Sequence, residues 1–353
     1  MNKVKLLGAT ICMVSNCAMA LDQGDYVFNG FGTAAVSRIG GVGDAKNYGF
    51  DGRTTDSWRG DQLSRLGGQF SYGLTDKLSA TVQTVAKAEQ DTWKLKLESA
   101  YLAYEINNQL TVRAGRLRPG VYMFSETLDV GYSYPWLRLP DEVYSQFPVS
   151  SFEGADVIYK IPTPLGSLDL QAQYGQATDR KVYIGQLDDQ LDLDLKEMVT
   201  GNIALNTDSF GTFRYGYSEA NVSVDGGAPA KGKFTSIGHR YDNGTVVTNA
   251  EAIKRRASGN SGSTQAFFVM AGYRVGDFLP HVTYAQLDIS DAGRQSSWAY
   301  GLNYSLTPSV TLKGEYKRVE STKGQSGVFT PDYTAARSTF DGDVISVGFD
   351  FIF

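Results

Sequence analysis

The chain has 353 residues, of which 12% are aromatic and 20% charged, and its formal net charge is −5. This acidic balance, without a run of basic residues, argues against a nucleic-acid-binding protein. After the first 20 residues, no stretch approaches the roughly 18 consecutive apolar residues of a transmembrane helix.

The N-terminus has the layout of a secretory signal peptide. Lys3 and Lys5 form a basic region, residues 6–14 form a short apolar region, and Ala18-Met19-Ala20 is a cleavage site. The sequence therefore predicts export of the chain and removal of residues 1–20.

The exported part, residues 21–353, contains no cysteine, because Cys12 and Cys17 both leave with the signal peptide. Disulfides and thiol chemistry are thereby excluded. Loss of the two N-terminal lysines reduces the 33 basic residues to 31, against 38 acidic ones, so the net charge becomes −7. A lipoprotein anchored at Cys17 is the alternative, although Asn16 fits poorly where a small residue is expected.

Residues 21–353 are predicted to form one all-β domain. Segments of about ten residues alternate apolar and polar side chains, and turn signals such as Asp242-Asn243-Gly244 separate them. We count 16 segments, and because four of them alternate poorly, 14 or 18 remain open. Connections after even-numbered segments are short and those after odd-numbered segments are mostly long. This asymmetry is typical of a transmembrane antiparallel β-barrel.

Residues 94–103 illustrate how the alternation assigns faces. Successive side chains of a strand point to opposite sides. The pattern predicts that Leu95, Leu97, Tyr101 and Ala103 face outward, and that Lys94, Lys96 and Glu98 face inward.

The alternation fails between residues 117 and 152. A loop of about 36 residues without regular structure is uncommon in a compact domain unless it is functional. Because it is tethered to two adjacent strands, it can reach the centre of a barrel lumen.

The last twelve residues have the clearest strand pattern. Ile345, Val347, Phe349, Phe351 and Phe353 share one face, and the opposite face is mostly small or polar. A strand with lipid on one side and water on the other needs this layout. A buried edge strand of a soluble β-sandwich is the alternative.

Three further segments carry a family resemblance. They are Val27-Phe28-Asn29-Gly30-Phe31-Gly32, Val112-Arg113-Ala114-Gly115-Arg116 before the long loop, and Phe152-Glu153-Gly154-Ala155-Asp156-Val157-Ile158-Tyr159 after it. Together with the signal peptide and the terminal aromatic strand, they make the chain resemble the Gram-negative general-porin superfamily.

The resemblance implies that the third loop, residues 117–152, folds into the barrel and constricts the pore. It also implies a homotrimer in the outer membrane of a Gram-negative bacterium, in contact with lipid and lipopolysaccharide. The barrel-assembly machinery would read a terminal signal made of Phe349, Phe351 and Phe353. The second loop departs from the family. At residues 89–92 it is very short, whereas the second loop of a porin often latches onto a neighbouring subunit.

Opposed charges are predicted at the constriction. The basic wall comprises Arg65, Lys87, Lys94, Lys96, Arg113 and Arg116, and the acidic loop comprises Glu126, Asp129, Asp141, Glu142 and Glu153. Such an arrangement makes a transverse field that orders polar solutes and water. The alternative is that these charges only keep a wet surface soluble.

Three other sets of residues have weaker functional interpretations. The loop is rich in aromatic residues, which can stack on sugar rings but more often pack a loop against a wall. The histidines, His239 and His281, lie on different predicted strands without a nucleophile motif, so we expect no enzyme. An acidic loop at 188–194 could bind calcium, but it lacks an EF-hand spacing.

The sequence thus predicts a water-filled channel for passive diffusion of small hydrophilic solutes and ions. The net charge and the acidic loop predict a mild cation preference. A channel selective for sugars or organic acids is the alternative, followed by a structural or adhesive barrel. We expect no cofactor and no metal.

Overall fold

The computed structural model describes residues 21–40, 45–49, 54–89, 91–184, 189–258, 263–290, 293–322, 327–331 and 340–353. The predicted signal peptide, residues 1–20, and Asp188 lie outside these described residues. No helix within them is long and apolar enough to cross a membrane.

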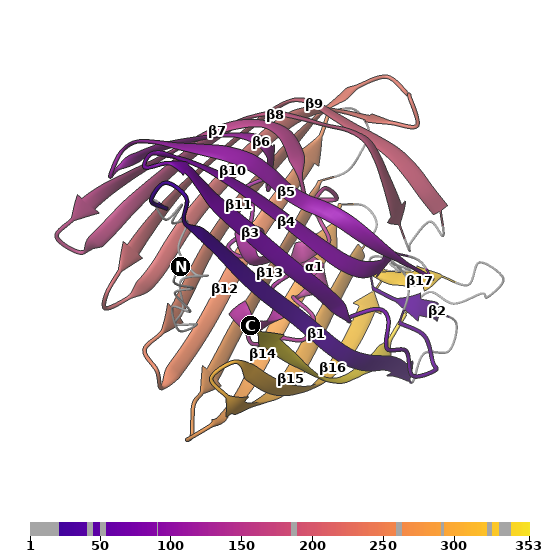
Figure 1. Ribbon diagram of the computed structural model, residues 1–353. Coiled ribbons are helices and arrows are strands. Elements are labelled where there is room, and N and C mark those ends of the chain that lie inside the picture. Colours follow the sequence, from indigo (N-terminus) through magenta and orange to yellow (C-terminus); the bar gives the residue numbers. More distant parts are fainter. Residues whose placement is uncertain are drawn as a thin grey trace.

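Sixteen strands of the described chain close into an antiparallel barrel (Figure 1), which confirms the predicted fold class and strand number. The strands are β1 (Tyr26–Gly40), β3 (Arg65–Thr75), β4 (Leu78–Glu89), β5 (Thr92–Asn107), β6 (Leu110–Leu117), β7 (Phe152–Thr163), β8 (Gly166–Ile184), β9 (Asp189–Thr207), β10 (Gly211–Val224), β11 (Ala230–Asp242), β12 (Val246–Ala257), β13 (Thr264–Tyr273), β14 (Phe278–Ile289), β15 (Gly293–Thr307), β16 (Val310–Thr322) and β18 (Gly342–Ile352).

Five shorter elements of the described chain lie in the connections. The strands β2 (Ala45–Tyr48) and β17 (Phe329–Pro331) pair with each other in a separate two-stranded sheet. The connection between β6 and β7 contains two single-turn 3₁₀ helices, Ser125–Thr127 and Gly131–Ser133, and the short helix α1 (Asp141–Tyr144).

The barrel closes by pairing β18 with β1 on one side and with β16 on the other. Alternation along β18 is as predicted: the side chain of Val347 is 52% exposed, whereas Asp350 is completely buried. Gly30 and Gly32 on β1 have no side chains, and the rings of Phe353 and Phe351 cover the space that a Cβ would need. The terminal aromatics therefore pack over the seam that closes the barrel.

The two ends of the barrel differ. One end, here called the turn end, has the short connections such as 208–210 and 243–245, together with the C-terminus. The other end, here called the loop end, has the connection between β6 and β7. Several connections at the loop end are shorter than predicted, because the strands continue beyond the expected boundaries.

The predicted acidic loop is one of these corrections. Asp189, Asp192 and Asp194 lie within β9, a 19-residue strand that pairs with β8 and β10. Leu193 and Leu195, which alternate with the aspartates, are buried against Phe152 and other apolar side chains of the inner wall. The alternation of Leu and Asp is thus a strand pattern with a polar outer face.

A β-bulge in β5 gives a second correction. Gln83 pairs with Ser99 and Thr84 with Leu97, so Glu98 is the extra residue. A bulge reverses the faces of the residues that follow it. Ala103 is accordingly buried, with 1% of its surface exposed, and Tyr101 lies beside the inward-facing Arg113. The prediction that Tyr101 and Ala103 face outward is wrong.

Candidate functional site on the inner wall

The segment 118–151 contacts inward-facing side chains on many strands of the barrel. The backbone nitrogen of Gly120 donates to Gln173 on β8 at 2.7 Å, and that of Met123 donates to Glu251 on β12 at 2.9 Å. Trp136 donates through Nε1 to Thr283 on β14 at 2.8 Å. Figure 1 shows α1 within the ring of strands, and α1 contacts β12, β13 and β14.

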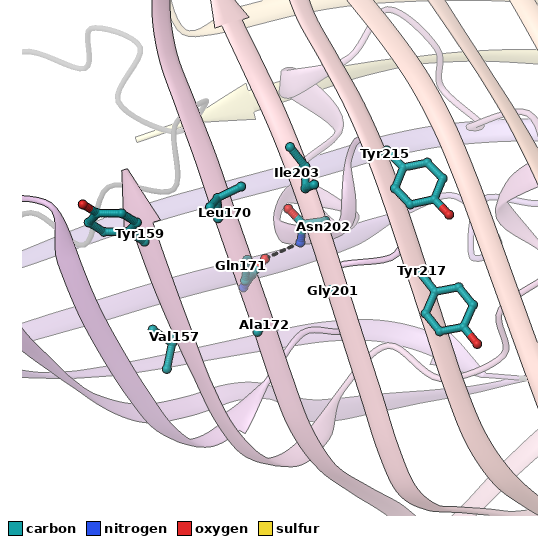
Figure 2. Close-up of a pocket in the computed structure, with 10 residues that line it drawn as sticks. All are labelled: Val157, Tyr159, Leu170, Gln171, Ala172, Gly201, Asn202, Ile203, Tyr215 and Tyr217. Atoms are coloured by element: carbon teal, nitrogen blue, oxygen red, sulfur yellow. Dashed lines mark hydrogen bonds between the residues drawn. The ribbon is translucent and has the colours of Figure 1, made fainter. Parts of the chain in front are cut away.

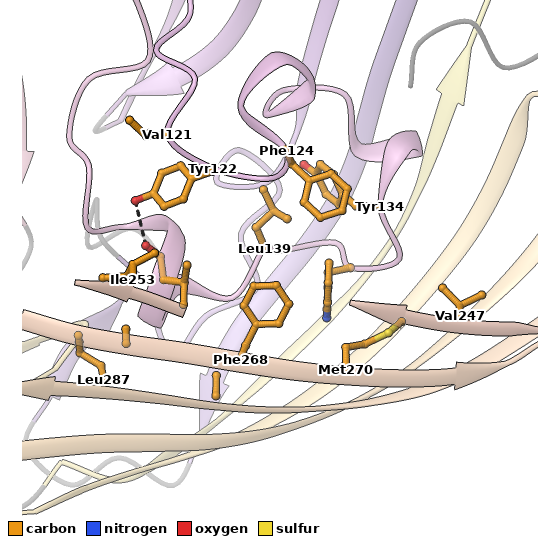
Figure 3. Close-up of a cluster of buried hydrophobic side chains, with 14 of the residues drawn as sticks. Val121, Tyr122, Phe124, Tyr134, Leu139, Val247, Ile253, Phe268, Met270 and Leu287 are labelled. Atoms are coloured by element: carbon orange, nitrogen blue, oxygen red, sulfur yellow. Dashed lines mark hydrogen bonds between the residues drawn. The ribbon is translucent and has the colours of Figure 1, made fainter. Parts of the chain in front are cut away.

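An apolar cluster attaches this segment to the wall of β11–β14 (Figure 3). Tyr122, Phe124, Tyr134 and Trp136 each have 4% or less of their surface exposed. The Trp136 ring meets that of Phe268 edge-on, with 5.3 Å between centroids. These aromatics therefore fill space between segment and wall and present no open stacking surface. Burial raises the pKa of Tyr134 to about 12.

Asp129 joins the segment to β4. Its carboxylate accepts from Lys87 Nζ at 2.8 Å and from Arg118 Nη2 at 2.6 Å. Burial by itself would raise the pKa of Asp129, but Lys87, Arg118 and Arg65 outweigh burial and hold that pKa well below its usual range. Asp129 therefore stays ionised at neutral pH, and its ion pair with Lys87 holds the segment against β4.

Glu142 joins α1 to β15 and β16. One carboxylate oxygen accepts from Ser297 at 2.7 Å and from Gln295 at 3.1 Å, and the other accepts from Lys317 Nζ at 3.0 Å. Burial opposes ionisation, but Lys317 and Ser297 lower the pKa of Glu142. The neighbouring Asp141 has a pKa raised chiefly by burial, although Arg138 lies 3.7 Å from it.

Two further cations of the wall contact the segment or the carboxylates beside it. Arg113 on β6 donates to Asp156 on β7 at 2.5 Å and to Glu126 at 3.1 Å. Lys313 on β16 donates to the backbone oxygens of Gly131, Tyr134 and Trp136, and pairs with Asp350 at 2.6 Å.

The predicted basic wall divides into three groups. Arg65, Lys87 and Arg113 contact the segment, Arg65 through the Tyr134 hydroxyl at 2.5 Å. Lys94 and Lys96 lie near the rim at the loop end and pair with Glu89.

Arg116 and Glu153 are not brought into the inner wall. Arg116 lies directly opposite Ala100 and Glu153 in the register, three residues beyond the inward Arg113, which puts both charges on the outer face. They pair with each other at 2.6 Å, and Arg180 also pairs with Glu153. Of the predicted acidic residues, Glu126, Asp129, Asp141 and Glu142 lie in the segment.

Sequence reasoning missed several of the partners. Two buried carboxylates of the strands, Glu98 and Glu251, bond to the segment. Two others, Asp156 and Asp350, bond to wall cations that contact the segment. Alternation places Asp350 and Lys313 on the inner face, but it does not reveal which residues across the lumen they meet.

The residues considered for catalysis or metal binding are not brought together in the described structure. His239 on β11 faces outward, and His281 is buried on β14. Within the described residues, no three His, Cys, Asp or Glu side chains are grouped to hold a metal.

A hollow of about 380 Å³ lies on the outer wall of β7–β10 (Figure 2). The small residues Ala172 and Gly201 form its floor between Tyr159, Tyr215 and Tyr217. Because these tyrosines belong to the outward-facing set, the hollow is separate from the inner wall.

A closed barrel with an apolar outer face and a polar, charged inner wall is a transmembrane β-barrel of the outer-membrane type. The chain belongs to the Gram-negative porin family, whose family model matches residues 9–324. It is an outer-membrane channel protein. A search of curated proteins by sequence found no match.

Solved structures agree in fold. The anion-selective porin from Comamonas acidovorans is 17% identical, with a TM-score of 0.60 over 94% of this chain and all of that one. OmpF of Salmonella typhi in complex with daunomycin is 15% identical, with a TM-score of 0.62 over 94% and 98%. The trimer form of in-vitro folded OmpT of Vibrio cholerae is 12% identical, with a TM-score of 0.56 over 94% and 100%.

Proposed function

We propose that the protein is a diffusion porin in which residues 117–152 narrow a water-filled lumen. The supporting observation is the way the loop is held: Asp129 bonds to Lys87 on β4, and the backbone nitrogen of Met123 donates to Glu251 on β12, on the opposite side of the barrel. A loop bonded to inward side chains of distant strands crosses the lumen and leaves a restricted passage. Conductance of the purified protein in planar bilayers tests this function. A protein that inserts but forms no channel contradicts it, and would favour the structural or adhesive barrel.

We further propose a mild cation preference. The net charge of residues 21–353 supports it, as does the 35% exposure of the Glu126 side chain, against 6% for Arg113 and 2% for Arg118. The acidic group of the loop is thus more accessible to passing ions than the basic groups beside it. The reversal potential in a salt gradient measures the preference, and an anion-selective potential contradicts it.

Combined replacement of Arg65, Lys94 and Arg113 by glutamine is expected to increase cation preference. Unchanged ion ratios would mean that these side chains do not line the constriction. Because Lys94 pairs with Glu89 near the rim, the Lys94→Gln variant alone is a control for the general effect of removing one positive charge.

Selectivity for sugars is the weaker alternative, since the loop aromatics are packed in the apolar cluster. Saturable inhibition of conductance by one solute class would favour it, whereas general diffusion predicts no such inhibition. We assign no enzymatic activity.

A homotrimer assembled by the barrel-assembly machinery, in contact with lipid and lipopolysaccharide, completes the proposal. The similarity to the trimer form of OmpT supports the trimer, whereas the short connection between β4 and β5 offers little for a latch. Mass measurement in mild detergent distinguishes trimer from monomer.

A further inference from the structure

Most cations of the inner wall have a carboxylate partner. Lys87, Arg113, Lys313 and Lys317 each lie within 3.0 Å of one. Within the described chain, four inward arginines have no carboxylate within 4 Å, and two of these have a neutral side chain as partner: Arg65 bonds to Tyr134, and Arg255 bonds to Thr264. The remaining two, Arg214 and Arg240, lie on the adjacent strands β10 and β11.

Arg214 and Arg240 are neighbours on one patch of wall. In the register, Thr212 is opposite Arg240 and Arg214 is opposite Gly238, so the two arginines are diagonal neighbours. Such residues lie about 7–8 Å apart, close enough for long side chains to converge on one ligand. Both are near the turn end of the barrel. Arg214 is three residues after the start of β10, and Arg240 is two residues before the end of β11.

The loop covers the wall beside this pair without neutralising it. Arg214 Nη2 donates to the backbone oxygen of Gly120, while its Nη1 is buried and has no partner in the described structure. The Arg240 guanidinium lies 5.4 Å from the centre of the Phe124 ring, and none of its N–H groups has an acceptor among the described residues. Two guanidinium groups therefore retain free donors next to each other.

Two carboxylates on the neighbouring part of the wall, those of Glu251 and Asp242, already have other hydrogen-bond partners. Glu251 uses its oxygens for the Met123 nitrogen and the Tyr144 hydroxyl. Asp242 bonds to Arg274 through both oxygens at 3.0 Å. A half-buried cation without an anion is costly, because it has lost water without gaining an opposite charge.

The residues opposite Arg214 are small. Ala204 on β9 and Gly238 on β11 lie opposite Arg214, one on each side. Guanidinium groups bind carboxylates and phosphates through paired hydrogen bonds, with a fixed geometry that favours planar or tetrahedral oxyanions.

We propose that Arg214 and Arg240 form an anion-binding site on the inner wall, on the turn-end side of the loop, for small solutes with a carboxylate or phosphate group. Its role as a step along a permeation path rests on the proposed channel function, but binding itself does not. A channel with a mild overall cation preference would thus contain a local binding site for anionic solutes.

The test compares the wild type with Arg214→Gln/Arg240→Gln, with inorganic phosphate and succinate as separate probes. Titration calorimetry of the detergent-solubilised protein is expected to give saturable binding of at least one probe. The double variant should bind at least about tenfold more weakly, since each charge-assisted pair contributes roughly that factor or more. Arg256→Gln is the matched control, because Arg256 lies opposite Lys233 on the outer face. The control should bind as the wild type does.

Planar-bilayer recording separates the site from the channel. If the wild type conducts, the bound probe should reduce chloride current in a saturable manner, and the double variant should lose this effect. Absence of conductance would overturn the channel function and leave the calorimetric result to decide the site. No saturable binding by the wild type, or equal binding by the double variant with a normal heat-modifiable band on electrophoresis, overturns the anion site.

Discussion

Replacement of Lys317 by methionine tests whether charge holds α1 against the barrel wall. Glu142 is completely buried, and Lys317 is its only cationic partner within 3.5 Å in the described structure. Removing one member of a buried pair costs about 3–5 kcal/mol, because the other charge is left without compensation. The structure can avoid that cost by releasing α1 from the wall. At about 3 kcal/mol, the population of released loop rises roughly 150-fold.

Trypsin provides a direct assay of loop release. Arg138 precedes α1 and its side chain is only 8% exposed, whereas cleavage after Arg118 is blocked by the following Pro119. We expect Lys317→Met to accelerate cleavage after Arg138 by about a hundredfold, in line with the released population. In bilayers the same variant should conduct more and fluctuate more.

Two variants control this experiment. Lys317→Met/Glu142→Gln removes both charges and should recover much of the wild-type protection, as replaced buried pairs often do. Lys94→Met removes a half-exposed lysine near the rim and should have no effect. The reasoning is refuted if Lys317→Met matches the wild type in both cleavage and conductance.

Three further outcomes follow from the barrel seam and from Asp129. Gly30→Val should reduce the yield of folded barrel, measured by its electrophoretic shift, because a Cβ would lie 2.2 Å from the Phe353 ring; Gly314→Ala, with open space, is the control. Deletion of Phe353 should slow membrane insertion before it alters selectivity; an unchanged insertion rate would leave Phe353 a packing role only. The pKa of Asp129 is depressed, so its stabilising contribution is fully present above its ordinary value of 3.8 and disappears only as pH falls through the lower folded value. Conductance that depends on the Asp129 contacts should therefore stay constant between pH 7 and about pH 5, and a change in that range that Asp129→Asn abolishes would contradict this sign.

Alternation along the chain was sufficient to predict the barrel and many of its faces. A period of two alone predicts that the aromatic side chains of β18 face outward and that Arg113 and Lys313 face inward. The bulge at Glu98 could not be predicted, because an extra residue in β5 is defined by its pairing with β4, not by β5 alone. A strand pattern read without its partner therefore assigned Tyr101 and Ala103 to the wrong face.

Partners across the lumen were hidden for a different reason. Lys87, Lys94 and Lys96 have the same inward parity on neighbouring strands, yet only Lys87 reaches Asp129. Parity determines which face of the wall a side chain lies on, but not its height, that is, its position along the barrel axis. The height depends on the register and on the path of the loop, and neither has a local sequence signal.

The positions of the charged groups along the barrel axis change the expected origin of ion selectivity. The sequence suggests two opposed rows of charge, but Asp129 with Lys87, Glu142 with Lys317, and Asp156 with Arg113 largely cancel each other. Such pairs position the loop and produce little net field beyond the pair. The field that a passing ion meets must then come from groups without a close partner or with high exposure. We therefore expect single substitutions at Glu126, Arg214 and Arg240 to change ion ratios directly, whereas single substitutions within the buried pairs first change the position of the loop and its open-channel noise. The combined replacement of Arg65, Lys94 and Arg113 changes ion ratios because it removes three positive charges at once.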